Sequence, residues 1–148
     1  MTTCTLLSQK ALLAMPDSDY MNDDQLAYFE HTLRTLRDEI LREIQEAKER
    51  IAQHDASADP IDAASDQESM QTALRVVERR SKLLKKVNAS LEQIQEGNYG
   101  YCSVTGDPIG LNRLLARPTA TLSIAAKERQ EFFERTSGAG DPDDHEDE

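Results

Sequence analysis

The sequence predicts a mainly α-helical protein in which a long antiparallel coiled-coil hairpin projects from a small globular head. Aromatic residues make up 5% of the 148 residues and Trp is absent, which argues against a large compact core. Two heptad-like apolar seams of matching length run through the middle of the chain. A short break with a proline separates them, and two such helices fold back on each other to bury their narrow apolar stripes.

Residues 1–20 are expected to form a leader that is either loose or docked through its apolar residues, and residues 1–32 together hold this leader and the head part of the first long helix. Asn22 is a good N-cap for that helix. Asp23 and Asp24 follow in the first turn, where the helix dipole favours negative charge. The apolar seam of the first helix consists of Leu26, Phe29, Leu33, Leu36, Ile40, Ile44, Ala47 and Ile51.

The predicted coiled coil spans residues 33–97, with its tip near residues 54–64. Pro60 lacks a backbone donor and disfavours helix at the residue before it, so the helical pattern breaks there. A second periodic run begins near Ser65, and Gly97 is its expected stop. Its seam consists of Met70, Ala73, Val77, Arg80, Leu84, Val87, Leu91 and Ile94.

Residues 98–135 are expected to complete the head. A turn-rich start predicts a small β-hairpin around residues 105–106, followed by a short helix over 111–116 and a final helix over 122–135. The expected packing residues are Tyr99, Tyr101, Ile109, Leu111, Leu114, Leu115, Leu122, Ile124, Ala125, Phe132 and Phe133. Residues 136–148 are expected to form a flexible acidic tail.

The turn-rich segment has the length of a zinc ribbon, but its residues do not fit one. Such a ribbon holds zinc with two C-x-x-C pairs about 17 residues apart. The corresponding positions are Cys102, Thr105, Ser123 and Ala126. One thiol, two hydroxyls and a methyl do not hold tetrahedral zinc, so we expect a degenerate zinc-finger-like fold that is closed by packing without metal.

Composition excludes several classes of function. The net charge of −11 argues against binding of the whole chain to DNA or to anionic lipid. No apolar run approaches the ~20 residues that span a bilayer, and a signal peptide is not expected. Cys4 and Cys102 give no disulfide framework, so a reducing cytoplasm fits. No His-Cys pair, Ser-His-Asp order or phosphate loop occurs, which argues against an enzyme.

Two groups of charged residues are candidates for function. Asp59 and Asp62 lie in the break, where they act either as a turn former and an N-cap or as negative charge offered to a cation in a deep channel. The second helix carries bases that either pair with glutamates of the first helix or dock an acidic or phosphorylated partner. The bases are Arg75, Arg79, Arg80, Lys82, Lys85 and Lys86, and the glutamates are Glu39, Glu43, Glu46 and Glu49.

Six short pieces occur in order between Leu12 and Arg135. They are Tyr20-Met21-Asn22, Asp59-Pro60-Ile61-Asp62-Ala63-Ala64, Lys82-Leu83-Leu84-Lys85-Lys86, Tyr99-Gly100-Tyr101-Cys102, Ile109-Gly110 and Arg113-Leu114-Leu115-Ala116-Arg117-Pro118-Thr119-Ala120. Together they resemble the DksA/TraR family of bacterial RNA polymerase regulators, in its full-length form. The last piece is quite specific, and all six in order are a strong signal.

The resemblance implies a head made from both chain ends and a coiled coil that enters the secondary channel of RNA polymerase without binding DNA. It implies that the tip approaches the active centre and alters promoter complexes together with guanosine tetraphosphate (ppGpp). A cytoplasmic monomer without a cofactor of its own is expected. By this resemblance the tip residues are Asp59, Asp62 and Ala64, the polymerase-docking base is Arg79, and the ppGpp-binding residues are Leu83, Lys86, Arg117 and Lys127.

The chain departs from the family pattern in two places. Ala63 replaces the usual Arg after the second tip aspartate, which weakens or re-aims the tip. Only Cys102 remains of the four zinc ligands, as in cysteine-poor paralogues that keep the regulatory role without zinc, and this suggests a backup for zinc-limited cells. Two other classes stay open: a structural coiled-coil adaptor or holdase-like protein, and a redox or metal sensor that acts through Cys102.

Overall fold

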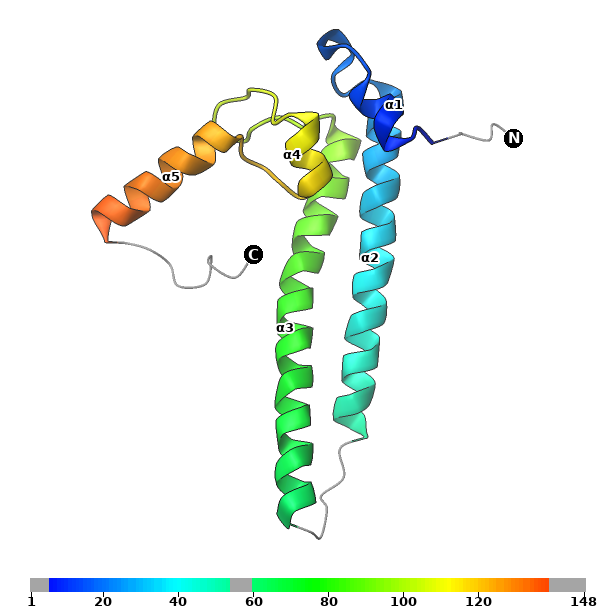
Figure 1. The fold of residues 1–148 in the computed structure, drawn as a ribbon, viewed down its shortest axis with the longest axis vertical. Helices are drawn as coiled ribbons and strands as arrows, with labels where there is room; N and C mark the ends of the chain where they lie inside the picture. Colours follow the sequence, from blue (N-terminus) through cyan, green and yellow to red (C-terminus); the bar gives the residue numbers. More distant parts are fainter. Residues whose placement is uncertain (1–5, 54–59, 139–148) are drawn as a thin grey trace. The chain divides into compact units, whose positions relative to one another are not determined.

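The computed structural model describes residues 6–53 and 60–138, with the backbone alone for residues 60–62 (Figure 1). These residues form five α-helices and one 3-10 turn and contain no β-strand. In chain order the elements are α1 (Gln9–Leu13), η1 (Asp17–Asp19), α2 (Asp23–Ala52), α3 (Pro60–Glu96), α4 (Leu111–Ala116) and α5 (Ile124–Ser137). The chain divides into two compact units, residues 1–99 and 100–148. Among the described helices, none has the length and apolar character that a membrane span requires.

The start of α2 follows from its capping residues. The Asn22 side chain accepts a hydrogen bond from the Gln25 backbone N–H at 2.9 Å, and Asp23 and Asp24 occupy the first turn. This confirms the predicted cap. The predicted seam is also confirmed along the helix, where the buried apolar side chains are Phe29, Leu33, Ile40, Ile44 and Ala47.

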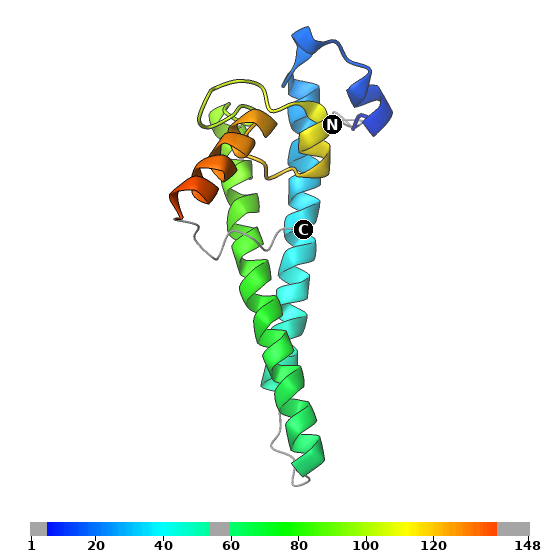
Figure 2. The same ribbon diagram turned by 60° about the vertical axis from the view of Figure 1, so that its left-hand side comes forward.

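The two long helices pack against each other as the predicted antiparallel hairpin. They lie side by side in two views that differ by 60° (Figures 1 and 2). The α3 seam contributes the buried residues Ala73 and Val87. Ser90, which directly precedes the seam residue Leu91, is buried as well. One ion pair joins the helices, with Arg80 Nε 2.6 Å from a Glu43 carboxylate oxygen.

Helix α3 begins earlier than the sequence pattern predicted. It starts at Pro60 rather than near Ser65, because the fixed φ of proline suits the first turn of a helix and its missing N–H has no intrahelical partner there. It ends as predicted, since Gly97 has a φ of 82° and the Asn98 N–H donates to the Gln93 carbonyl at 2.9 Å.

Helix α3 extends past the end of α2. In the antiparallel register marked by the Glu43–Arg80 pair, Ala52 comes level with Gln71, because each lies nine residues from its member of the pair. The part of α3 from Pro60 to about Met70 therefore has no α2 residue beside it, and Figure 1 shows α3 running past the end of α2. We call this part the α3 overhang.

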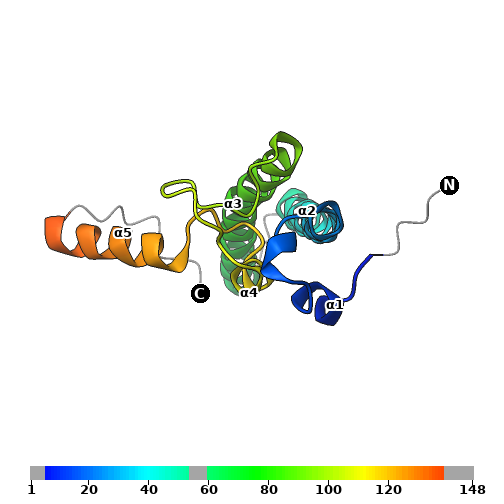
Figure 3. The ribbon, with the colours of Figure 1, turned by 90° about the horizontal axis from the view of Figure 1, so that it is seen from above.

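Of the two possibilities that the sequence left open for the leader, its described residues adopt the docked one. Leu12 of α1 is fully buried, and the leader lies beside the first turns of α2 (Figures 2 and 3). The buried side chain of Gln25 fastens it: the amide oxygen accepts the Met21 N–H at 2.8 Å, and the amide nitrogen lies 3.3 Å from the Met15 sulfur. A buried amide with both ends satisfied is a specific anchor.

Aromatic packing closes the base of the hairpin. The rings of Phe29 and Tyr99 lie 5.6 Å apart, and both side chains are almost fully buried. Burial, together with the neighbouring Tyr20, raises the pKa of the Tyr99 phenol above its ordinary value. Tyr99 therefore stays neutral at physiological pH and acts as a core residue.

The second unit differs in three details from the prediction. The expected β-hairpin is reduced to a single antiparallel bridge between Tyr101 and Pro108. The final helix begins at Ile124 rather than Leu122, because the Ser123 hydroxyl caps it by accepting the Ala126 N–H at 3.2 Å. Tyr101, Ile124, Phe132 and Phe133 were expected to pack but are exposed, at 39%, 57%, 61% and 62%, and Ala126 is the buried residue of α5.

Candidate functional site

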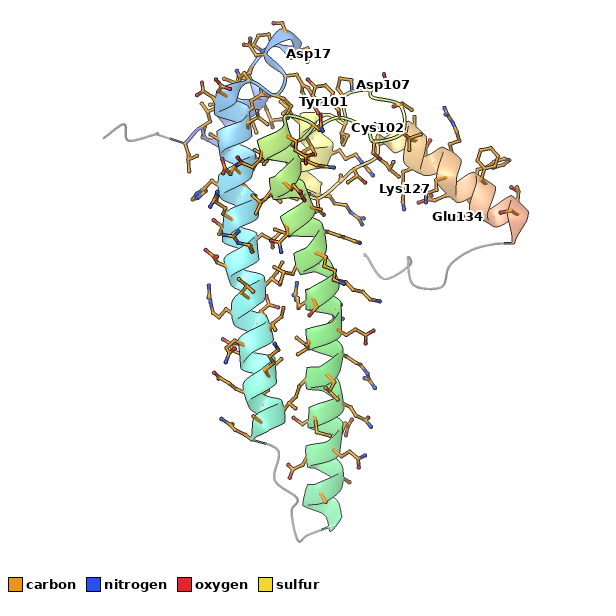
Figure 4. The ribbon with its side chains drawn as sticks, turned by 180° about the vertical axis from the view of Figure 1, so that it is seen from behind. Asp17, Tyr101, Cys102, Asp107, Lys127 and Glu134 are labelled. Atoms are coloured by element: carbon orange, nitrogen blue, oxygen red, sulfur yellow. The ribbon has the colours of Figure 1, made fainter. Side chains whose placement is uncertain are left out.

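The turn between Cys102 and Asp107 is closed by backbone hydrogen bonds. The Cys102 N–H donates to the Asp107 carbonyl at 2.7 Å, and the Gly106 N–H donates back to the Cys102 carbonyl at 2.9 Å. The Ser103 N–H reaches the Thr121 carbonyl at 2.9 Å and ties the turn to the segment before α5. Figure 4 shows Cys102 and Asp107 together on this turn-rich segment.

The Cys102 thiol lies in an environment that favours its ionised form. It is 3% exposed, yet hydrogen bonds from the Thr105 side chain and from the Ser123 backbone lower its pKa to about 6. Burial acts in the opposite direction and is outweighed. The hydrogen bonds therefore join Cys102 to two of the other predicted ligand positions.

The residues at these positions do not fit a four-cysteine zinc site. Cys102 supplies the one thiol, Thr105 is engaged with Cys102 and with the Asp107 N–H at 3.3 Å, and Ser123 caps α5. The fourth position, Ala126, offers no ligand atom. Among the described residues no group of three or more His, Cys, Asp or Glu side chains is arranged to hold a metal ion. Hydrogen bonds and an N-cap connect the positions that a metal would otherwise link.

Four bases form a straight stripe on α3. Arg75, Arg79, Lys82 and Lys86 follow one another at steps of four, three and four residues, which places them on one helix face. All four are exposed. We call this set the basic stripe, and it extends over ~16 Å of helix, with Glu78 as an acidic neighbour of Lys82.

The structure answers the question whether these bases pair with the glutamates of α2. Arg80 pairs with Glu43, but Arg80 lies in the seam and not in the basic stripe. Lys82 makes a long contact of 3.9 Å with Glu78 of its own helix. For Arg75 and Arg79, no ion pair occurs among the residues that the structure describes. The pairing between these bases and the glutamates of α2 therefore includes the Glu43–Arg80 pair, while Arg75 and Arg79 of the stripe take no part in it.

The four implied ppGpp-binding residues divide between the two units. Leu83 and Lys86 lie one turn apart on α3, with Leu83 half-buried and Lys86 exposed. Arg117 is the exposed C-cap of α4, and its N–H donates to the Arg113 carbonyl at 2.8 Å. Lys127 lies in the first turns of α5, as Figure 4 shows.

The implied tip is only partly described. Asp59 lies outside the described residues, and the Asp62 side chain does so as well. The backbone places Asp62 in the first turn of α3, where the helix dipole favours a carboxylate. Ala64 is exposed in the second turn.

Two residues with a clear structural role were not singled out from the sequence. Gln25 anchors the leader, and its only sequence signal is a polar side chain on the apolar side of an amphipathic helix. Glu43 appeared as one of several glutamates, while its partner Arg80 stood out as a charge within an apolar seam. A search for the α2 carboxylate that lies opposite Arg80 in the antiparallel hairpin would have identified Glu43 as its partner.

The fold and the degenerate metal positions define a class of protein: a helical hairpin followed by a zinc-finger-like unit that keeps one cysteine at the four ligand positions. Residues 25–94 match the family described as DnaK suppressor protein DksA, N-terminal domain, and residues 97–132 match the prokaryotic dksA/traR C4-type zinc finger. The chain therefore belongs to the DksA/TraR family, as the sequence motifs indicated.

Individual relatives cover most of the chain. The RNA polymerase-binding transcription factor DksA of Caulobacter vibrioides is 42% identical over 137 residues, which are 91% of this chain and 96% of the relative. The protein of the same name from Escherichia coli is 37% identical over 124 residues, 81% of this chain and 80% of the relative. The solved structure of transcription factor DksA2 from Pseudomonas aeruginosa has a TM-score of 0.79 and 44% identity, and the match covers 86% of this chain and 98% of that one.

Proposed function

We propose that this chain regulates transcription by binding bacterial RNA polymerase and inserting its helical hairpin through the secondary channel. The observation that carries the proposal is family membership over nearly the whole chain, with relatives named as RNA polymerase-binding transcription factors. Two helices of 30 and 37 residues, ~45 and ~55 Å long, give the hairpin the reach that a deep channel requires. The chain acts by protein contact and is not an enzyme.

The basic stripe supports a docking role for Arg79. Exposed bases on one helix face attract an acidic protein surface and speed its association. The net charge of −11 opposes binding to DNA, so the stripe serves a protein partner. Polymerase operates in the bacterial cytoplasm, and a monomer acting there fits this role.

The tip carries the regulatory effect in this proposal. Asp59, Asp62 and Ala64 approach the active centre, where the carboxylates meet cationic groups and alter the stability of promoter complexes. Ala63 carries no charge, so the two carboxylates act without a neighbouring Arg. Leu83, Lys86, Arg117 and Lys127 bind ppGpp at the interface with polymerase, since three cations suit a tetraphosphate.

The zinc-finger-like unit performs its part without zinc. The single thiol of Cys102 and the hydrogen bonds to Thr105 and Ser123 support this proposal. Such a chain keeps its structure when zinc is scarce and serves as a backup for metal-dependent paralogues. This role needs no cofactor besides ppGpp as a co-regulator.

Co-purification with core polymerase tests the proposed function. The tagged chain is expected to retain polymerase from a lysate, and Asp62→Asn is expected to retain it equally well while losing promoter regulation in a reconstituted transcription assay. Glu68→Gln, at an exposed carboxylate six residues further along α3, is the matched control. Capture of other proteins but not polymerase would favour the coiled-coil adaptor, and normal regulation by Asp62→Asn would contradict the role given to the tip.

A further inference from the structure

The Glu43–Arg80 ion pair joins the long helices where their heptad patterns differ. The two side chains are 41% and 34% exposed, so the pair is partly withdrawn from water. Arg80 is the one charged residue among the α3 seam positions, whose steps alternate strictly between three and four residues. The α2 seam instead takes two successive steps of four, from Leu36 to Ile40 to Ile44, and Glu43 lies inside this irregular stretch.

The apolar seam alone does not fix the register of the hairpin. Sliding α3 by one heptad, ~10.5 Å, brings most of the apolar seam opposite apolar side chains again, with Asp66 then entering the seam near Ile51. The α3 overhang leaves room for such a slide, after which Ala52 would lie level with Ala64 instead of Gln71. The residues between Ala52 and Pro60 are numerous enough to span either register, because an extended chain covers ~3.4 Å per residue.

The charged pair distinguishes the two registers. After this slide Glu43 would lie opposite Ala73 and Arg80 opposite Leu36, so each charge would face an apolar side chain. Ala73 is 2% exposed, and a charge brought against such a position loses hydration without gaining a partner. The Phe29–Tyr99 contact at the base of the hairpin also opposes a slide, through burial of two aromatic rings rather than through charge.

We propose that Glu43 and Arg80 are positioning residues that fix the register of α3 on α2 and thereby the reach of the hairpin tip. A polar pair within a coiled-coil seam selects one alignment at a cost in stability. The consequence for regulation rests on the proposed function, because the reach of the tip matters only if the hairpin enters a channel. The register itself is a property of the chain alone.

Disulfide formation between introduced cysteines measures the register. Ala47→Cys combined with Val77→Cys reports the observed register, since these seam positions lie four residues after Glu43 and three before Arg80. Ala47→Cys combined with Met70→Cys reports the slid register. Peptide mass spectrometry locates each disulfide, so Cys102 can stay in place. The first pair is expected to cross-link efficiently and the second only at background level.

Removal of the Arg80 charge is expected to change the yields of these two disulfides. In an Arg80→Leu background we expect the yield of the 47–70 disulfide to rise about tenfold, the factor that ~1.4 kcal/mol produces. The melting temperature is expected to stay the same or rise, because Leu suits an apolar seam. The charge swap Glu43→Arg with Arg80→Glu is expected to restore the original cross-links, while Glu43→Arg alone should increase the 47–70 disulfide.

Several outcomes would overturn the proposal. An unchanged disulfide pattern in Arg80→Leu would overturn it, whether or not the melting temperature falls. The Glu43–Arg80 pair would then contribute to stability but would not fix the register. Failure of the folded charge-swap variant to restore the pattern would do so as well. All cross-links are measured without polymerase. If they behave as expected while the wild-type chain fails to bind polymerase, the proposed function is wrong and the register assignment stands.

Discussion

At the scale of single residues, the second unit shows how hydrogen bonds connect positions that metal ligands occupy elsewhere in the family. The Cys102 thiol bonds to Thr105 and Ser123, and Ser123 in turn caps the helix at Ala126. Each link is worth ~1 kcal/mol, far less than a structural zinc ion contributes. The unit is therefore expected to be less stable than its zinc-binding counterparts but indifferent to metal supply.

The ionisation of Cys102 predicts a pH dependence of folding. The pKa of its thiol falls from about 9 to about 6 in the folded state. A group whose pKa is lowered by folding stabilises the folded state fully at pH values above its pKa in the unfolded chain. This stabilisation is lost as the pH falls through the pKa of the group in the folded state. We expect the free energy of unfolding to decrease from pH 9 to pH 6, measured by denaturant titration, and Cys102→Ser to flatten this dependence. Thiolate absorbance that titrates near pH 9 in the folded protein would contradict it.

Residue identity predicted the caps of the long helices but not the exposure of α5. Asn22 and Gly97 are specific because local geometry restricts which residues fit there. Phe132 and Phe133 were expected to be buried because of their apolar character, and they are exposed. The apolar character of a side chain indicates that it favours burial. It does not indicate whether the surface that buries it belongs to the same chain or to a partner.

At the scale of elements, the long helices have ends that depend on single side chains. We expect Asn22→Ala to lower the free energy of unfolding by ~1 kcal/mol, because the Gln25 N–H loses its acceptor. Asn88→Ala, at an exposed position inside α3, is the matched control and should leave stability unchanged or slightly higher. Equal effects of the two substitutions in chemical denaturation would show that the cap contributes nothing.

The zinc-finger-like element allows a direct test of its metal content. Protein purified from cells without a metal-affinity tag is expected to contain well below one zinc per chain by elemental analysis. A strong chelator should leave the melting temperature unchanged, because a single thiol does not retain zinc. Stoichiometric zinc that resists dialysis would contradict the proposed zinc independence.

Periodicity predicted the two long helices well, because a seam of eight almost entirely apolar positions leaves few alternatives. The start of α3 was predicted too late, since Pro60 was read as a break although it suits a first helical turn. The sequence left open whether the leader docks. Its order depends on Leu12 and on the bonds of Gln25, which are tertiary contacts that no local pattern reveals.

At the scale of the whole molecule, the implied ppGpp residues come from both units, so their roles can be separated by substitution. We expect Lys86→Ala or Arg117→Ala to reduce ppGpp potentiation in a transcription assay about tenfold or more, because each loses a charge-assisted contact worth ~1.5–3 kcal/mol. Basal regulation should change less. Lys85→Ala, also exposed on α3, is the control. Equal loss of basal and ppGpp-dependent activity would indicate a docking role instead.

The α3 overhang has a consequence for the energetics of association. About three turns of helix run on without the second helix to share their apolar side, and short unaccompanied helices are marginal in water. These turns should fray in the free protein and become fully ordered only when a binding partner surrounds them. Part of the favourable contact energy is then consumed by that ordering, so we expect association to be weaker, and more sensitive to temperature, than the contact area alone would indicate.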